Sequence, residues 1–258
     1  GKGPSEENVE IEGTEPYIVG GHTASGYWVD NNRATTIEGL YAAGDVAGGC
    51  PQKYVTGALA EGEIAAEAIL EYLNDKDDDR IAAKNTKEAL EHGEEQKLSQ
   101  IAIAKKAEYE SHLNASRSLM NAEQLEEAMQ KIMDQYAGGI GTDYRYSEMS
   151  LAKADEKIAA LLPVADTLAA TDTYELMQIY ELRERLIVCR AVIAHLAARK
   201  ETRWHSFGEN TDYPQQSEEW MKYVNSRMEN GEIKILYRDL ITKENTGLNT
   251  AEKGAGER

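Results

Sequence analysis

Residues 36–49 have the sequence Thr-Ile-Glu-Gly-Leu-Tyr-Ala-Ala-Gly-Asp-Val-Ala-Gly-Gly, an apolar run that leads directly into three glycines and one acid. The run predicts a strand whose end delivers the carboxylate of Asp45 to a ligand. Gly44 would let the backbone approach that ligand closely, and Asp45 can accept a hydrogen bond from a sugar-like hydroxyl. An ordinary tight turn with a capping aspartate fits these residues equally well.

A helix is predicted directly after this glycine loop. Between Val55 and Leu73, apolar residues recur at a spacing of three and four. The first turn of such a helix has backbone N–H groups without intrahelical partners and the positive end of the helix dipole, which together favour an electron-rich atom. Four acids of the helix are expected to face the solvent rather than to act as a catalytic pair: Glu61, Glu63, Glu67 and Glu71.

The use of glycine changes along the chain. Residues 1–73 hold 12 of the 21 glycines, and their alternating pattern predicts short strands at 17–19, 27–29, 36–37 and 40–43. Amphipathic patterns predict helices near 84–113, 122–137, 148–169 and 173–200. We therefore predict a first domain over 1–74, a mostly helical domain over 75–240 and a polar tail over 241–258. The charged run 75–80 is expected to be a solvated linker.

Composition and charge exclude several classes of protein. The 258 residues include 46 acidic and 28 basic side chains, a net charge of −18, so a nucleic-acid or anionic-membrane partner is disfavoured. Without an apolar run of about 18 residues, no stable membrane insertion is expected. Cys50 and Cys189 have no metal-ligand spacing, which suits a reducing compartment and predicts a cytoplasmic protein. The chain opens without Met, so we expect it to be part of a longer protein.

Two groups of residues carry a resemblance to a known family. The run 41–49, followed by Tyr54-Val55-Thr56-Gly57 and its helix, resembles the carboxy-terminal flavin-contacting segment of the fumarate reductase and succinate dehydrogenase flavoprotein superfamily. Within it, residues 20–30 and 44–50 resemble the alpha subunits of the adenylylsulfate reductase family. The resemblance implies an α+β fold: the end of a Rossmann-like FAD-binding domain, followed by a mostly helical domain, with residues 1–15 as a candidate end of a capping domain.

The resemblance also implies roles for individual residues. FAD would be the cofactor, and most of its contacts would come from an amino-terminal half that this chain lacks. His22 would be the catalytic residue, near the reactive face of the flavin, where it orients substrate or handles a proton. Asp45 would contact ribityl or ribose hydroxyls, and Gly44 would allow that approach. The backbone of three residues would face the pyrimidine edge of the isoalloxazine: Tyr54, Val55 and Thr56.

The resemblance further suggests a reaction and partners. Dicarboxylate-processing relatives carry Asn-Arg-Leu-Gly-Gly where this chain has Pro-Gln-Lys-Tyr at 51–54, so the arginine that clamps a carboxylate is missing and fumarate or succinate is disfavoured. The implied activity interconverts adenylylsulfate with AMP and sulfite through an FAD N5–sulfite adduct, with electrons from an iron–sulfur beta subunit. Because residues 1–73 have three bases against twelve acids, the chain alone is expected neither to hold FAD tightly nor to turn over.

Two other functions stay open. One is a different FAD oxidoreductase of the superfamily, such as an aspartate oxidase or a fumarate-type dehydrogenase. The other is a non-catalytic helical interaction module, which the helices between Lys84 and Arg199 alone would fit. Among the histidines of that region, His195 lies in an apolar run and is expected to be a satisfied core or interface residue, whereas His112 is expected to be exposed.

Overall fold

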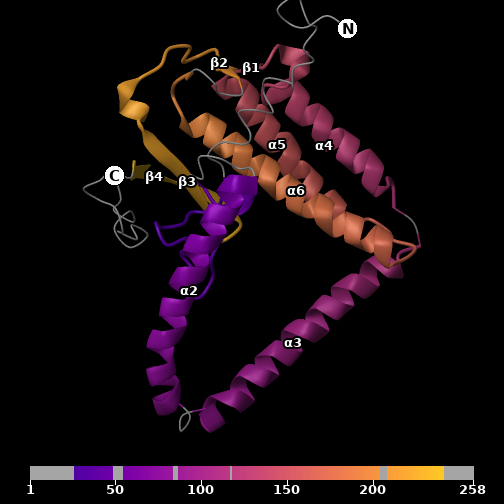
Figure 1. Ribbon diagram of the computed structural model, residues 1–258. Helices are drawn as coiled ribbons and strands as arrows, with labels where there is room; N and C mark the ends of the chain where they lie inside the picture. Colours follow the sequence, from indigo (N-terminus) through magenta and orange to yellow (C-terminus); the bar gives the residue numbers. More distant parts are fainter. Residues whose placement is uncertain (1–25, 49–54, 84–86, 117, 204–207, 241–258) are drawn as a thin grey trace, which may run out of the picture. The chain divides into compact units, whose positions relative to one another are not determined.

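The computed structural model describes residues 26–48, 55–83, 87–116, 118–203 and 208–240 (Figure 1). The chain divides into two compact units. Of the described residues, the first unit holds 26–48 and 55–68, and the second unit holds the remainder. The predicted strand end and the first turns of the helix that follows it therefore belong to the first unit.

The first unit has little regular strand. Its 3-10 turn η1 (Gly44–Val46) precedes the start of helix α2 (Val55–Ala83). The strands expected within residues 27–43 are present only as isolated bridges, because each pairing involves a single residue pair: Tyr27 with Ala47, Val29 with Thr35, and Ala34 with Tyr41. The expected strand at 17–19 lies outside the described residues. A small buried cluster holds this unit together: Val29, Ala42 and Ala47.

Helix α2 continues through the charged run that was expected to be a linker. The helix extends to Ala83, so residues 75–80 are helical rather than irregular, and their role as a solvated linker stays a prediction. The helix can continue because no Gly or Pro interrupts residues 63–83. The predicted domain limits, 1–74, 75–240 and 241–258, stay predictions.

The second unit contains the four predicted helices. They are α3 (Lys87–Leu113), α4 (Ala122–Tyr136), α5 (Glu148–Ala165) and α6 (Thr173–Ala198). Their starts follow local capping chemistry. Asn121 and Gln124 form a capping box at α4, with both hydrogen bonds present. The N-cap of α6 is Asp172, which accepts hydrogen bonds from two backbone N–H groups.

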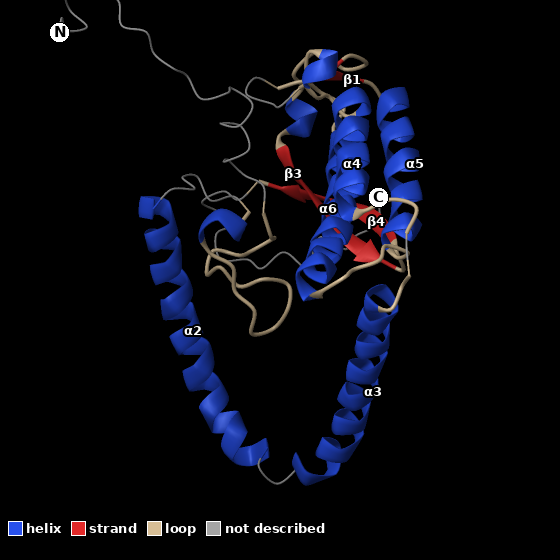
Figure 2. Cartoon of the chain, turned by 90° about the vertical axis from the view of Figure 1, so that its right-hand side faces the viewer, coloured by secondary structure: helices blue, strands red, loops and turns tan. Residues whose placement is uncertain are grey.

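The core of the second unit lies between α4, α5 and α6, which pack side by side (Figures 1 and 2). Its largest fully buried aliphatic side chains come from all three helices and from the loop after α5: Leu125, Leu151, Ile158, Leu168 and Leu186. Burying each such side chain contributes about 1.5–3 kcal/mol. This apolar layer provides the main hydrophobic stabilisation of the second unit.

Two small sheets complete the second unit. After η2 (Ile140–Thr142), β1 (Arg145–Tyr146) pairs in parallel with β2 (Glu209–Asn210). After η3 (Glu218–Trp220), β3 (Lys222–Glu229) pairs antiparallel with β4 (Glu232–Asp239), and this hairpin packs on α6. The hairpin was not predicted, although its turn residues Asn230 and Gly231 both have positive φ, as a two-residue hairpin turn requires. The mixture of helices and small sheets confirms the α+β class.

Candidate functional site

Gly44 occupies a position that only glycine fills without strain. It is buried, and its φ of +69° lies in the left-handed region. A Cβ added there would lie 3.3 Å from the Cβ of Ala58 on α2. The start of η1 and the beginning of α2 are therefore in close contact.

Asp45 lies inside η1 and is an exposed residue. The N-cap of η1 is Ala43, with no side-chain cap hydrogen bond, so Asp45 is not the N-cap of this turn. The turn itself is closed by the backbone N–H of Ala47, which donates to the carbonyl of Gly44 at 3.0 Å. An exposed carboxylate on a closed turn can accept hydrogen bonds from ligand hydroxyls.

The start of α2 presents backbone donors. Val55 is 77% exposed and Thr56 is also exposed, and the first turn contains no acidic residue. The first N–H groups of a helix have no intrahelical acceptor, and the helix dipole makes this end positive. The helix start can therefore donate to an electron-rich edge. Two other predicted site residues, His22 and Tyr54, lie outside the described residues.

Close backbone contacts support the turn that carries Asp45. The N–H of Tyr27 donates to the carbonyl of Val46 at 2.7 Å, and the N–H of Gly48 donates to the carbonyl of Tyr27 at 2.8 Å. A Cβ on Gly26 would come within 2.5 Å of the carbonyl carbon of Ala47. A side chain at position 26 would therefore collide with this backbone, so the approach needs glycine there.

An ion pair joins the loop before the strand end to α2. The Nε of Arg33 donates to Oε2 of Glu61 at 2.5 Å. Glu61 is only 4% exposed, so the expectation that it faces the solvent is wrong. The sequence held a signal for this burial, because Glu61 precedes the buried Ala65 and Ala68 by four and seven residues and so lies on their face of the helix.

The described residues of the first unit fit an FAD molecule in three respects. They provide a glycine where the backbone approaches α2, an exposed carboxylate that can accept hydrogen bonds from hydroxyls, and a helix start that can donate to the electron-rich edge of an isoalloxazine. The predicted binding residues Gly44, Asp45, Val55 and Thr56 are thus brought onto two adjoining elements.

A buried carboxylate organises the second unit after α6. Glu201, with a fully buried side chain, accepts hydrogen bonds from Arg199 at 2.7 Å, from Arg203 at 2.8 and 2.9 Å, and from the backbone N–H of Ser217 at 3.0 Å. Burial opposes ionisation of Glu201, but these donors outweigh it and hold its pKa below the ordinary value. These donors all lie in the second unit, so Glu201 holds together the segment that follows α6.

Two histidines of the second unit are engaged by the fold. His195 is half-buried, as predicted, and its Nε2 lies 2.9 Å from Oγ of Ser226 on β3. Burial, together with Arg199, lowers the pKa of His195 below 6.5. The prediction that His112 is exposed is wrong. This residue is only 5% exposed, and its Nδ1 lies 2.7 Å from the carbonyl oxygen of Leu168.

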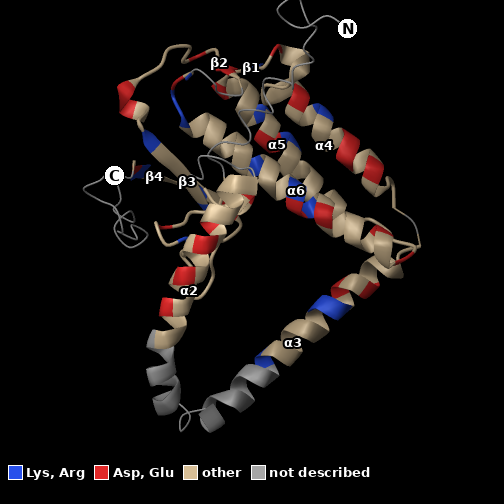
Figure 3. Cartoon of the chain, in the orientation of Figure 1, with Lys and Arg blue, Asp and Glu red and all other residues tan. Residues whose placement is uncertain are grey.

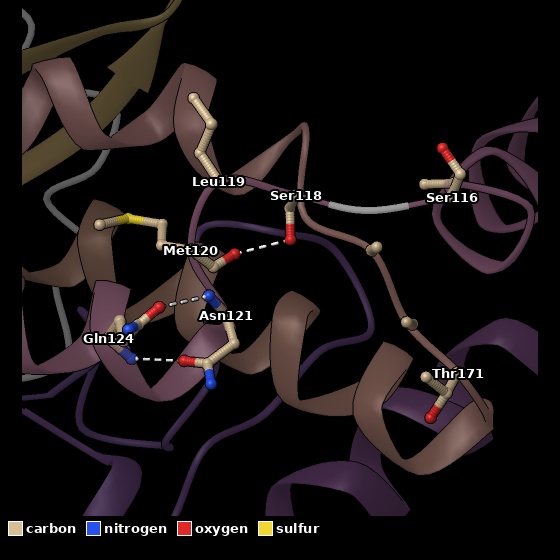
Figure 4. Close-up of a pocket in the computed structure, with 10 residues that line it drawn as sticks. Ser116, Ser118, Leu119, Met120, Asn121, Gln124 and Thr171 are labelled. Carbon is tan, nitrogen blue, oxygen red and sulfur yellow. Dashed lines mark hydrogen bonds between the residues drawn. The ribbon is translucent and has the colours of Figure 1, made fainter.

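A shallow cavity of about 320 Å³ lies between residues 115–116 and 118–121 on one side and residues 169–171 on the other (Figure 4). Several of its polar side chains already form local hydrogen bonds. Ser118 Oγ donates to the carbonyl of Met120, Asn121 and Gln124 form the capping box, and Thr171 Oγ1 donates to Glu175. With its polar groups committed to helix caps and turns, this cavity offers little to hold a ligand.

Acidic side chains recur along α2 and α4 (Figure 3). In the part of the chain that the structure describes, no group of three or more His, Cys, Asp or Glu side chains is arranged to hold a metal ion. No described helix combines the length and apolar character needed to cross a membrane.

Comparison with known proteins gives matches to one group of flavoproteins. The family described as "Fumarate reductase flavoprotein C-term" matches residues 126–252. The alpha subunit of adenylylsulfate reductase from Megalodesulfovibrio gigas is 30% identical over 254 residues, covering 87% of this chain and 37% of that protein. The chain thus spans little more than a third of the length of that relative.

Two solved structures agree with this match. Adenylylsulfate reductase from the hyperthermophilic Archaeoglobus fulgidus is 31% identical with a TM-score of 0.65, and the match covers 81% of this chain and 33% of that one. A structure of adenosine-5-phosphosulfate reductase in complex with sulfite, described as a covalent adduct, is 32% identical over the same shares, also with a TM-score of 0.65.

Proposed function

Because the chain belongs to the fumarate reductase and succinate dehydrogenase flavoprotein superfamily, we propose that it is part of the alpha subunit of an adenylylsulfate reductase. The proposed reaction interconverts adenylylsulfate with AMP and sulfite. The observation that carries the proposal is the close approach of Gly44 to Ala58 on α2. This approach brings the carboxylate of Asp45, which can accept hydrogen bonds from hydroxyls, and the start of α2 into one unit. The full-length protein would include further sequence, so this activity is proposed for the whole subunit.

The residues of this chain would bind the cofactor from one side. The carboxylate of Asp45 would accept hydrogen bonds from ribityl or ribose hydroxyls, and Gly44 would leave room for that approach. The backbone N–H groups of Tyr54, Val55 and Thr56 would donate to the pyrimidine edge of the isoalloxazine. FAD, when bound, would supply the two-electron redox chemistry between sulfite and adenylylsulfate.

Substrate handling is proposed for His22. In its neutral form the imidazole can accept a proton, and in its charged form it can orient an anion such as sulfite. A structure of a relative is described as a covalent adduct with sulfite, which supports sulfite as a ligand of this family. The FAD N5–sulfite adduct that the resemblance implies is part of the proposal. Cationic ligands for the adenylylsulfate phosphate would come mainly from residues outside this chain, because residues 1–73 hold only three bases.

The partners follow from the same family. Electrons would be exchanged with a beta subunit that carries iron–sulfur clusters, and the complex would work in the cytoplasm. The name of the relative from Megalodesulfovibrio gigas, subunit alpha, fits a protein with at least one further subunit. The acidic balance of the chain is consistent with a protein partner rather than with nucleic acid.

The proposal is tested on the full-length subunit with its flavin. Sulfite is titrated while the visible absorption of the flavin is followed, and adenylylsulfate turnover is measured with and without fumarate or succinate as competing substrates. Bleaching by sulfite and turnover of adenylylsulfate are expected. A flavoprotein that ignores sulfite and turns over a dicarboxylate would instead be another oxidoreductase of the superfamily. A protein without flavin would favour a helical interaction module.

Two substitutions test the assigned residues. Asp45→Ala should weaken FAD binding by about 1–3 kcal/mol, as expected for the loss of a charge-assisted hydrogen bond. His22→Ala should slow adenylylsulfate turnover while leaving flavin bound. Glu63→Gln, an exposed change on α2, serves as the control. Unchanged flavin retention would reject the role of Asp45, and unchanged turnover would remove His22 from the mechanism.

The 258-residue chain by itself is expected neither to retain FAD tightly nor to turn over, because it would supply only one side of the binding site. Purification of the chain with added FAD, followed by gel filtration and measurement of bound flavin, tests this point. Recovery of stoichiometric flavin would show that the described residues make most of the binding site, contrary to the proposal.

A further inference from the structure

The ion pair between Arg33 and Glu61 joins two parts of the first unit that are 28 residues apart in sequence. The side chain of Glu61 is 6% exposed and that of Arg33 is 19% exposed. Removing a carboxylate from water costs free energy unless a charged donor pairs with it, and Arg33 is that donor for Glu61. The two side chains must therefore keep their hydrogen-bonding distance and orientation, which water does not enforce in exposed ion pairs.

Arg33 also binds the loop on its own side. Its Nη1 donates to the carbonyl oxygens of Asn31 at 2.8 Å and of Asp30 at 3.2 Å. The carboxylate of Asp30 in turn accepts hydrogen bonds from the backbone N–H groups of Asn32 and Ala34. With its Nε and Nη1 both engaged inside the protein, Arg33 acts on structure and is poorly placed to serve as a ligand for an anionic substrate.

The backbone of Arg33 is held in an uncommon conformation. Its φ of 66° is in the left-handed region, which costs a residue with a Cβ about 1–2 kcal/mol. The carbonyl of Arg33 accepts a hydrogen bond from the N–H of Ala42 at 3.0 Å, two residues before Gly44. Such strain persists where the surrounding contacts determine the conformation, and it is often found beside functional sites.

Arg33 thus binds both elements of the candidate site. Its main chain pairs with the segment that ends at Gly44 and Asp45. Its side chain pairs with Glu61 on α2, one turn after Ala58, the residue that Gly44 contacts. These two contacts therefore link the segment that ends at Gly44 to α2, and a change at the pair is expected to alter how the two elements are placed.

On the basis of the proposed function, we propose that Arg33 and Glu61 are positioning residues that set the FAD affinity of the subunit. In this proposal the pair keeps the turn that carries Asp45 next to the first turn of α2, so that both elements can bind one flavin nucleotide. It acts through these elements and does not itself touch the cofactor or the substrate. A pair that is merely structural would affect flavin binding only as far as it affects folding.

The test uses the full-length subunit and separates stability from positioning. Three variants are compared with wild type: Glu61→Ala, which leaves Arg33 without its carboxylate; Glu61→Gln, which keeps the shape; and the double variant Arg33→Met with Glu61→Leu. Replacing both members of a buried pair by apolar residues is often neutral for stability. The exposed change Glu63→Gln is the matched control on the same helix.

Three quantities are measured for each protein: the FAD dissociation constant, the visible circular dichroism of the bound flavin, and the thermal unfolding midpoint without FAD. Glu61→Ala is expected to lower the midpoint and to raise the dissociation constant at least about tenfold, a factor that corresponds to about 1.4 kcal/mol. The double variant should recover the midpoint but keep the raised dissociation constant and an altered dichroism. Glu61→Gln should raise the dissociation constant with a smaller loss of midpoint.

The outcomes distinguish this inference from the function on which it rests. A double variant that recovers both the midpoint and the FAD affinity would show a purely structural pair and overturn the proposal. If the double variant does not fold, an unchanged dissociation constant for Glu61→Gln overturns it equally. A wild-type subunit that binds no flavin refutes the proposed function itself, whereas normal flavin binding in every variant refutes only the positioning role.

Discussion

Removal of the carboxylate of Glu201 is expected to destabilise the second unit strongly. In Glu201→Ala, the guanidinium groups of Arg199 and Arg203 lose their common acceptor, and the N–H of Ser217 loses its partner. Breaking a buried ion pair costs about 3–5 kcal/mol. Because the two arginine side chains are 32% and 28% exposed, water recovers part of this loss, and we expect about 2–3 kcal/mol.

The assay is thermal and urea unfolding of the 258-residue chain followed by far-ultraviolet circular dichroism, which reports mainly on the helices. A loss of this size corresponds to a midpoint about 5–10 °C lower for a unit of this length. The control is Arg145→Gln, which breaks an exposed pair with Glu209 and should cost less than about 1 kcal/mol. An equal effect of the two substitutions would refute the reasoning.

The dependence on pH provides a second check on Glu201. Its pKa in the folded protein lies below the ordinary value of 4.5, so its stabilising contribution is complete above pH 4.5 and is lost as the pH falls through the folded value. The difference in unfolding free energy between wild type and Glu201→Gln should therefore shrink below pH 4.5. A constant difference down to lower pH would mean that the charge of Glu201 does not stabilise the fold.

Two further predictions concern Gly44 and His195. Gly44→Ala should destabilise the first unit by about 1–2 kcal/mol, because the new side chain combines a positive φ with a Cβ 3.3 Å from that of Ala58. Faster hydrogen exchange of residues 40–48 would report this loss, and protection equal to wild type would contradict the strain. The lowered pKa of His195 means that its protonation opposes folding, so wild type should lose stability relative to His195→Gln as the pH falls below 6.5, and parallel pH profiles would contradict this.

Helices and their starts were predicted well because their signals are local. The capping box at α4 depends on Asn121 and Gln124, three residues apart, and both hydrogen bonds are formed. The hairpin of β3 and β4 also had a local signal, the pair Asn230-Gly231 between two strand-forming runs. The prediction of a mostly helical domain did not include this hairpin, although the sequence indicated it.

Burial of individual polar residues was predicted poorly because it depends on distant partners. Glu61 was expected among solvent-facing acids, yet it is buried against Arg33. His112 was expected to be exposed, yet it is buried against the carbonyl of Leu168, 56 residues away. Helical periodicity places a residue on a face of its helix, but it does not say which face another segment will cover.

The sequence by itself determined the turn at residues 44–48, the start of α2 and the approximate spans of the helices in the second unit. Each of these features depends on neighbours within one or two turns of chain. Only the tertiary structure decided that Gly44 contacts α2, that Arg33 pairs with Glu61 and that Glu201 binds two arginines. These contacts require segments that are distant in sequence to meet, and their cost in chain entropy is met by packing across the whole unit.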